Sequence, residues 1–292
     1  MPMPVPREWE SEAVSIWVGS ASGGSLVSAD EARVSVLDHG FTVGDGVFET
    51  LKVVDGTPFA LTRHLRRLRT SAEGLGITPI PDVMIRSAVA ELLAANAEAI
   101  GPFARLRITC TAGISPLGSD RGDVPTTLVV AAAPTPVWPA VTSVATVPWP
   151  RNERSALAGI KSTSYAENVI ALAAAHRGGA SEALLPNTRG DLCEGTGTNV
   201  FVVVGGQLLT PPLHGGCLPG ITRELVLEWC GGEETDLPMA VLEAAEEVFL
   251  TSSTRDVHPV ARVDDRDLVA PGPVTAGVVA QFAARSTADM DP

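Results

Sequence analysis

The chain contains 292 residues, 45% of them hydrophobic and 19% charged, which is the composition of a folded globular protein and not of a disordered one. That length exceeds what one hydrophobic core usually supports, so we expect two domains. The formal net charge of −13 disfavours binding to nucleic acids or anionic membranes, which are themselves negatively charged.

Targeting, membrane and metal signals are weak throughout the sequence. No run approaches the ~20 apolar residues that a membrane helix needs, and the first ten residues do not form a signal peptide, so we expect a cytoplasmic protein. The four cysteines have no C-x-x-C spacing and no accompanying histidine cluster. We therefore expect neither a metal site nor a disulfide framework.

The first part of the chain is predicted to form strands and then helices. Apolar and polar residues alternate over residues 13–37, which predicts two or three strands. The sequence G-D-G-V-F-E-T over residues 44–50 predicts a glycine turn that opens another strand, and that strand should end at the hairpin signal of residues 55–56. A helix is expected after Thr62 as its N-cap, with Arg63 in the first helical position and a stop at Gly76, and a second helix over residues 82–99.

Two arginines then share one strand. The period of two over residues 105–111 places Arg105 and Arg107 on the same face. Burying two charges in an apolar strand is costly without a partner, so they indicate either surface ion pairs or a bound carboxylate. Three prolines within residues 134–139 predict a stiff connector between an N-terminal domain of residues 1–133 and a C-terminal domain of residues 140–292.

Lys161, in the second half of the chain, is a candidate for a reactive lysine. Ser164 and Glu167 match a capping box, which predicts a helix that begins just after Lys161 and ends at residues 178–179. The partial positive charge of a helix N-terminus lowers the pKa of a nearby ammonium group. A lysine that forms an imine needs such a lowered pKa. A last helix is expected over residues 273–285, and the tail after Ser286 is expected to fray.

The most informative stretch is residues 194–223. It opens with E-G-T-G-T-N-V-F, continues through a strand, a Gly205-Gly206 hairpin and L-L-T, and closes with L-P-G-I-T-R. The last segment predicts a helix whose first backbone amides could bind a phosphate. Together with Lys161, the acid, the Asn-aliphatic-aromatic triplet, the L-x-T and the L-x-G-I-x-R resemble the class IV aminotransferase family, the fold-type IV enzymes that use pyridoxal phosphate.

The resemblance implies an α/β protein of two α/β domains with the cofactor site between them, working as a homodimer on a small-molecule amine. It implies that Lys161 holds pyridoxal 5′-phosphate as a Schiff base and acts as the catalytic base, and that Glu194 pairs with the pyridine nitrogen. The residues implied to bind the cofactor are Arg63, Lys161, Tyr165, Glu194, Thr198, Asn199, Ile221, Thr222 and Ser253, and those implied to bind substrate are Phe41, Arg107 and Thr254.

Three activities are compatible with this resemblance. F-E-T over residues 48–50 looks more like the lyases that convert 4-amino-4-deoxychorismate to 4-aminobenzoate and pyruvate in folate biosynthesis, and this is the activity we expect. Tyr165 and Arg107 look more like a branched-chain or D-amino-acid transaminase, which is the alternative. A catalytically inactive binding protein is the third, but the joint presence of Lys161, Glu194 and Arg63 argues against it.

Overall fold

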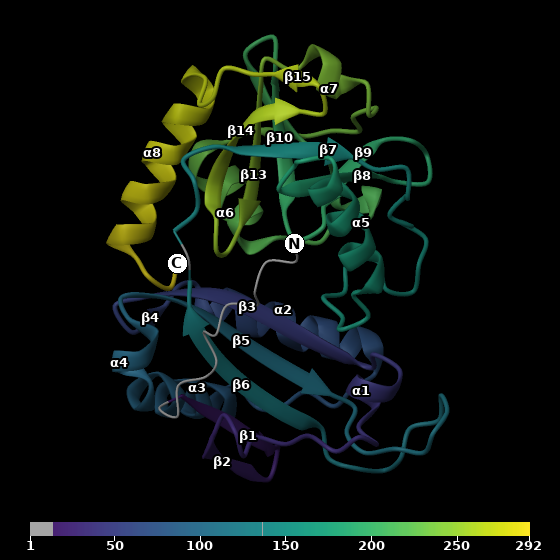
Figure 1. Ribbon diagram of the computed structural model, residues 1–292, viewed down its shortest axis with the longest axis vertical. Helices are drawn as coiled ribbons and strands as arrows, with labels where there is room; N and C mark the ends of the chain where they lie inside the picture. The colour runs from purple at the N-terminus through teal and green to yellow at the C-terminus, as the bar shows by residue number, and fades with distance from the viewer. Residues whose placement is uncertain (1–13, 136) are drawn as a thin grey trace. The chain divides into compact units, whose positions relative to one another are not determined.

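The computed structural model describes residues 14–135 and 137–292, which form two compact units (Figure 1). Of the described residues, the first unit holds 14–135 together with Ile160–Ser164 and Met290–Pro292, and the second holds Val137–Gly159 and Tyr165–Asp289. The chain enters the second unit inside its proline-rich stretch. Two short segments, Ile160–Ser164 and Met290–Pro292, thus belong to the first unit although they come later in the chain. The sequence had predicted that each domain is one continuous stretch.

The first unit is an antiparallel sheet covered by helices on one face (Figure 1). Its strand order is β2-β1-β6-β5-β3-β4. Alternate residues of the central strands, such as Leu51, Leu106 and Leu128, are fully buried and pack with apolar residues of the helices. The elements are β1 (Ser15–Ser20), β2 (Gly23–Ser28), α1 (His39–Thr42), β3 (Gly46–Val54), β4 (Thr57–Pro58), α2 (Leu61–Leu75), α3 (Asp82–Ala95), α4 (Ala97–Ile100), β5 (Phe103–Thr111) and β6 (Thr127–Pro134).

The second unit contains a mixed sheet of nine strands in the order β12-β11-β10-β13-β14-β7-β8-β9, with β15 paired to β14. β7 runs parallel to both β8 and β14. Glycines at positive φ, Gly205 and Gly206, connect β10 to β11, so the predicted hairpin is confirmed. The elements are β7 (Thr142–Thr146), α5 (Ala166–Arg177), β8 (Glu182–Pro186), β9 (Leu192–Gly195), β10 (Asn199–Val204), β11 (Gln207–Thr210), η1 (Leu213–Gly215), α6 (Ile221–Cys230), β12 (Glu233–Glu234), α7 (Val241–Ala244), β13 (Glu247–Ser252), β14 (Asp256–Val263), β15 (Arg266–Asp267) and α8 (Pro273–Ala288).

The expected α/β fold class is confirmed, and one predicted helix is divided into two. The helix predicted over residues 82–99 breaks at Asn96, whose side chain accepts from Ser15 N at 2.8 Å and donates to Ser15 O at 2.9 Å. These two hydrogen bonds tie Asn96 to the start of β1 at the point where the segment divides into α3 and α4. Among the described residues, no helix has the length and apolar character to cross a membrane.

The expected fraying of the tail is wrong. Ala60 N donates to Met290 O at 2.7 Å, and Asp291 accepts from Thr62 N at 2.7 Å and from Thr62 Oγ1 at 2.6 Å. The N-cap position of α2 is Ala60, at φ 54°, which has no side chain able to cap, so Thr62 is an internal helix residue and not the predicted cap. Asp291 therefore supplies the capping carboxylate from the other end of the sequence.

We expect Asp291→Ala to lower the free energy of unfolding by about 0.5–2 kcal/mol, the usual cost of losing a helix N-cap. Asp291→Asn should retain most of the stability, because its amide oxygen still accepts from Thr62 N. Chemical denaturation of both variants measures the effect, with Asp265→Ala as a control at an exposed turn of the second unit. A denaturation midpoint of Asp291→Ala equal to that of the control would contradict the capping role.

Candidate active site

Lys161 lies in the short return to the first unit, where its main chain is held by a strand and a helix. Phe48 N donates to Lys161 O at 3.0 Å, and Lys161 N donates to Ser71 Oγ of α2 at 3.2 Å. The Nζ atom lies 4.5 Å from the centroid of the Phe48 ring. The lysine backbone therefore has a fixed position beside β3, and its amine lies against an aromatic ring.

The capping box predicted after Lys161 is wrong. Ser164 Oγ donates to Gly44 O at 3.0 Å instead of capping a helix, and α5 begins at Ala166 after Tyr165, which makes no side-chain cap. Glu167 lies 3.6 Å from Arg151. Lys161 lies five residues before the first residue of α5, so the lowered pKa expected for its amine stays a prediction.

A buried carboxylate that sequence reasoning missed belongs to β3, on the face of the strand that points into the core. Glu49 is fully buried and accepts from Arg67 Nε at 2.8 Å, Arg67 Nη2 at 2.6 Å and His64 Nδ1 at 2.6 Å. Burial alone would raise the pKa of Glu49, but Arg67 and His64 outweigh it and lower the pKa to about 2. The period-two position of Glu49 between Val47 and Leu51 was the available signal, since an acid on the core face of a strand needs a partner.

This cluster of Glu49, His64 and Arg67 is electrostatically linked to Lys161. Burial lowers the pKa of His64, Glu49 opposes that shift, and the charges of Arg67 and Lys161 add to it. The imidazole is therefore neutral near pH 7 and donates its Nδ1 proton to Glu49. Ser71, which binds Lys161 N, lies one helical turn after Arg67 on α2.

On the other face of β3, the Phe48 ring is the meeting point of Lys161 and of Arg107 from the neighbouring strand β5. Arg105 and Arg107 lie on the same face, as predicted, and that face is exposed, so neither charge is buried. The Arg107 guanidinium carbon is 3.8 Å from the centroid of the Phe48 ring, and its Nε donates to Thr109 Oγ1 at 3.2 Å. Lys161 and Arg107 therefore contact the same aromatic ring.

In the second unit, Glu194 of β9 is buried between two hydrogen-bond donors. Its Oε1 accepts from Arg151 Nε at 3.0 Å and its Oε2 from Leu218 N at 2.8 Å. Arg151 also donates to Asn168 Oδ1 at 3.1 Å, which fixes the guanidinium in place. A charged donor and a backbone amide both favour the ionised carboxylate. Sequence reasoning missed Arg151, because 43 residues separate it from Glu194.

The turn after Glu194 is held from both sides. The Tyr165 hydroxyl donates to Thr196 O at 2.9 Å, and Asn168 Nδ2 donates to the same carbonyl. On the other side, the buried carboxylate of Glu182 accepts from Thr196 N at 3.1 Å and from Thr198 Oγ1 at 3.4 Å. Burial raises the pKa of Tyr165, with the charge of Glu194 as the next cause. These hydrogen bonds hold the turn in place. They also join Tyr165 and Thr198, two of the predicted site residues, in one network.

The N-cap position of α6 is Gly220, which packs closely against Asn199. A Cβ built on Gly220 would lie 1.9 Å from Asn199 Oδ1, while Asn199 Nδ2 donates to Leu218 O at 2.9 Å. No side chain caps α6, and Ile221 and Thr222 in its first turn are buried. Ser253 and Thr254 follow β13 in a half-buried turn. The first backbone amides of α6 are therefore not capped by a side chain and are available to bind an anion.

The remaining predicted residues lie in the first unit. Arg63 is the third residue of α2, and its Nε donates to Pro292 O at 2.8 Å. Phe41 lies in α1 with 75% of its surface exposed. The structure therefore divides the predicted site into two groups, with Phe41, Arg63, Arg107 and Lys161 in the first unit and Tyr165, Glu194, Thr198, Asn199, Ile221, Thr222, Ser253 and Thr254 in the second.

The donor set of the second unit fits pyridoxal phosphate. Glu194 offers an ionised carboxylate that can hold the proton of a pyridine nitrogen, and the first amides of α6 can bind a phosphate group. Thr251 Oγ1 is buried next to Asn199 on the neighbouring strand and has no hydrogen-bond partner within residues 14–135 and 137–292. The same described residues contain no cluster of three or more metal-ligating side chains.

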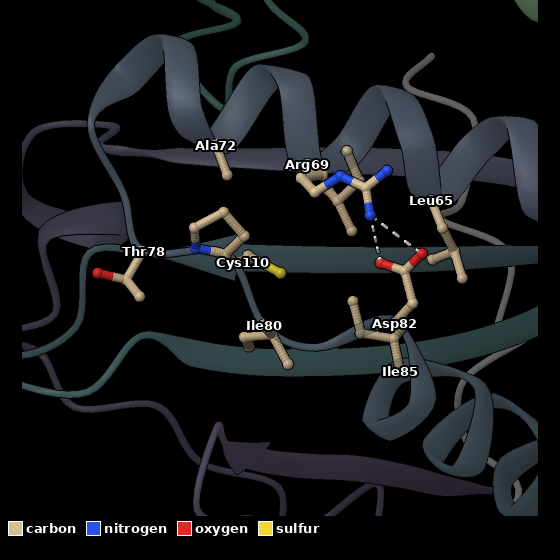
Figure 2. A pocket seen from close by; sticks show the side chains of 10 residues that line it. Leu65, Arg69, Ala72, Thr78, Ile80, Asp82, Ile85 and Cys110 are labelled. Atoms are coloured by element: carbon tan, nitrogen blue, oxygen red, sulfur yellow. Dashed lines mark hydrogen bonds and ion pairs between the residues drawn. The ribbon is translucent and has the colours of Figure 1, made fainter.

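A small pocket elsewhere in the first unit contains none of the predicted site residues. It lies between α2 and α3, and Figure 2 shows Arg69 and Asp82 paired at its rim at 3.4 Å. Its lining is otherwise mostly apolar and includes Leu65, Ile85 and Cys110. Burial raises the pKa of the Cys110 thiol to about 12, so the pocket carries no reactive group near neutral pH.

Comparison with known proteins gives one consistent result. The family model for amino-transferase class IV matches residues 46–263. A "putative branched-chain-amino-acid aminotransferase" of Methanocaldococcus jannaschii is 35% identical over 254 residues, covering 83% of this chain and 87% of that protein. The D-alanine aminotransferase of Bacillus licheniformis is 31% identical over 274 residues, covering 87% of this chain and 92% of that protein.

Solved structures have the same fold. A branched-chain aminotransferase from Thermoproteus uzoniensis, crystallised with norvaline, matches with a TM-score of 0.84 at 29% identity, covering 92% of this chain and 93% of that one. A "putative 4-amino-4-deoxychorismate lyase" from Legionella pneumophila matches with a TM-score of 0.80 at 26% identity, covering 87% of this chain and 95% of that one. Proteins described under both names therefore share this fold.

Proposed function

The chain belongs to the class IV aminotransferase family, whose cofactor is pyridoxal phosphate, and from that membership we propose that it transfers an amino group between an amino acid and a 2-oxo acid. The observation that supports this most directly is the contact of Lys161 and Arg107 with one aromatic ring, Phe48. An amino acid carries its nitrogen and its carboxylate on one carbon. It therefore needs the reacting lysine and a carboxylate-binding guanidinium side by side.

In this proposal Lys161 has two tasks, and Glu194 and Arg107 have one each. Bound pyridoxal phosphate supplies a ring that withdraws electrons from the carbon bearing the amino group. Lys161 holds the cofactor through Nζ in the resting protein, and during turnover the same atom takes the proton from the substrate carbon. Glu194, kept charged by Arg151 and Leu218 N, holds a proton on the pyridine nitrogen. Arg107 binds the substrate carboxylate, which fixes the carbon to be deprotonated near Lys161.

The lyase reaction remains the second candidate. The preference that F-E-T gave it is not confirmed, and the two relatives reported above are both named aminotransferases, so we place it second. One feature favours it: 4-amino-4-deoxychorismate carries two carboxylates, and Arg105 lies two residues from Arg107 on the same exposed face of β5. A pair of guanidinium groups suits a dianionic substrate better than a simple amino acid.

A substrate panel separates the two. The protein loaded with pyridoxal phosphate is given D-alanine, L-leucine and L-isoleucine with a 2-oxo acid acceptor, and separately 4-amino-4-deoxychorismate without any acceptor. We expect transamination of at least one amino acid. Its kcat/KM should be well above the kcat/KM for pyruvate release from aminodeoxychorismate. Pyruvate release from aminodeoxychorismate, together with inert amino acids, would replace the aminotransferase with the lyase.

We also propose that the protein works as a homodimer through the first unit. Val36, Leu37 and Phe41 before and within α1, and Ile114 and Leu117 after β5, are apolar and exposed. Backbone contacts join the two segments, since Ser115 N donates to Leu37 O at 3.2 Å and Asp38 bridges to Ile114. Exposed apolar patches of this kind mark interaction surfaces.

Sedimentation of Phe41→Asp should then show a shift from dimer to monomer, and a wild-type monomer would refute the proposal.

Two arginines of α2, Arg63 and Arg67, are candidates to bind the cofactor phosphate. The sequence assigns it to Arg63, whose Nε donates to Pro292 O, whereas the contacts of α2 favour Arg67, which lies one turn nearer to Ser71 and Lys161. We expect Arg67→Ala to weaken pyridoxal phosphate binding roughly tenfold or more, the effect of losing a charge-assisted hydrogen bond. Titration of the cofactor into both apo variants decides between them, and loss of affinity in Arg63→Ala alone would restore the sequence-based assignment.

A further inference from the structure

We propose that Arg121 is a positioning residue for Lys161, because it fixes the turn to which the lysine's segment is hydrogen-bonded. The proposal rests on the proposed function only in taking Lys161 as the reacting lysine. Arg121 lies in the irregular segment between β5 and β6, 40 residues before Lys161 in the sequence. Nothing in the local sequence pattern connects the two, and the link exists only in the folded unit.

The first step is the contact between the lysine's segment and the turn of residues 44–46. Thr163 N donates to Gly46 O at 2.8 Å, Thr163 Oγ1 donates to Gly44 O at 2.9 Å, and Ser164 Oγ donates to the same Gly44 carbonyl at 3.0 Å. Two residues that follow Lys161 closely are therefore bonded to the carbonyls on either side of Asp45. The position of the lysine backbone depends on the position of this turn.

The turn is also built to approach the segment closely. A Cβ on Gly44 would lie 2.8 Å from Ser164 Oγ, and Gly44 has a φ of +70°, a conformation that favours glycine. A Cβ on Gly46 would lie 3.0 Å from Thr163 Oγ1 and 2.9 Å from Cys110 O. Close packing therefore explains why glycine occupies both positions. The three hydrogen bonds depend on this close approach of the turn.

The second step is the bidentate pair between Asp45 and Arg121. Arg121 Nε donates to Asp45 Oδ2 and Arg121 Nη2 to Asp45 Oδ1, both at 2.6 Å. Burial would raise the pKa of Asp45, but Arg121 and then His39, whose Nδ1 lies 3.5 Å from Oδ2, outweigh it and lower the pKa. The carboxylate is thus charged at neutral pH, and the paired geometry sets the orientation of the turn.

The third step ties the same arginine to α2. Arg121 Nη1 donates to the carbonyl of Gly76, the residue that ends α2, at 3.0 Å. Ser71 on that helix accepts the hydrogen bond from Lys161 N. One guanidinium group therefore holds both structures that fix the Lys161 backbone: the turn on one side and the end of the helix on the other.

Hydrogen exchange on the full-length protein loaded with pyridoxal phosphate tests this directly. In Arg121→Gln we expect the amides of residues 161–164 to exchange roughly tenfold faster or more, because local opening becomes easier when charge-assisted hydrogen bonds are removed. Covalent loading of the cofactor onto Lys161 should slow, and kcat should fall with little change in KM. Arg121→Lys keeps the charge but not the paired geometry, so it should restore only part of each effect.

Arg69→Gln is the matched control, since it removes the Arg69–Asp82 pair of the same unit, at 3.4 Å and half-exposed, with no bond to the turn (Figure 2). A lower melting temperature of Arg121→Gln, with exchange of residues 161–164 no faster than in the control, would overturn the proposal. If Arg121→Gln does not fold, Asp45→Asn carries the same measurement. Faster exchange in a protein that transaminates no amino acid would support the positioning role while refuting the proposed function.

Discussion

Lys161→Ala is expected to abolish amino-group transfer and covalent cofactor attachment while leaving the fold intact. The side chain sits against the Phe48 ring and is half-buried, and the contacts that hold the segment are made by its main chain, so the truncation leaves them in place. A positioned acid or base alone contributes roughly 10²–10⁴-fold to a rate, and this variant also loses the covalent link. We therefore expect kcat to fall by at least that factor.

The sequence offers a matched control, because it contains only two lysines. Lys52 lies in the same strand as Phe48, with its Nζ 4.5 Å from the Phe59 ring. Lys52→Met should keep both turnover and covalent loading. Peptide mass analysis after borohydride reduction then places the cofactor, and attachment at Lys52, or normal turnover in Lys161→Ala, would remove Lys161 from its proposed role.

Glu194→Gln is expected to give the second largest loss. The substitution keeps the size of the side chain and one acceptor for Leu218 N, but it removes the negative charge that faces Arg151. Without that charge the pyridine nitrogen is less able to keep its proton, and the ring withdraws electrons less strongly. Removing one preorganised electrostatic contact typically costs about 10²–10³-fold in kcat, which is the loss we expect.

Glu167→Gln provides the control for this substitution, because Glu167 also pairs with Arg151, at 3.6 Å, but is largely exposed. Exposed ion pairs contribute little, so its kcat should stay close to that of the wild type. The two variants are compared by steady-state kinetics at saturating cofactor. Equal activity in Glu194→Gln and Glu167→Gln would show that the charge of Glu194 is not used in the reaction.

Local patterns predicted those parts of the fold that depend on near neighbours. The glycine hairpin at residues 205–206, the glycine start of α6 at Gly220 and the shared face of Arg105 and Arg107 all follow from turn chemistry or from the period of two. These features need no information about distant residues.

The errors arise where a side chain chooses a partner far away in the sequence. Ser164 has the right spacing for a capping box but bonds Gly44, 120 residues away, and α2 is capped by Asp291, 229 residues from Thr62. The Glu49 cluster was missed for the same reason, since the pattern shows that an acid faces the core but not which groups neutralise it. Periodicity fixes which face a residue occupies, and tertiary packing decides what it meets there.

The most direct test of the aminotransferase account is a half-reaction without any acceptor. The protein loaded with pyridoxal phosphate is mixed with one amino acid that the panel identifies, and the 2-oxo acid released per chain is measured. The account predicts one equivalent of 2-oxo acid from the wild type, with the cofactor recovered as pyridoxamine phosphate, and none from Lys161→Ala. Failure of every amino acid to yield a 2-oxo acid, together with pyruvate release from 4-amino-4-deoxychorismate, would contradict it.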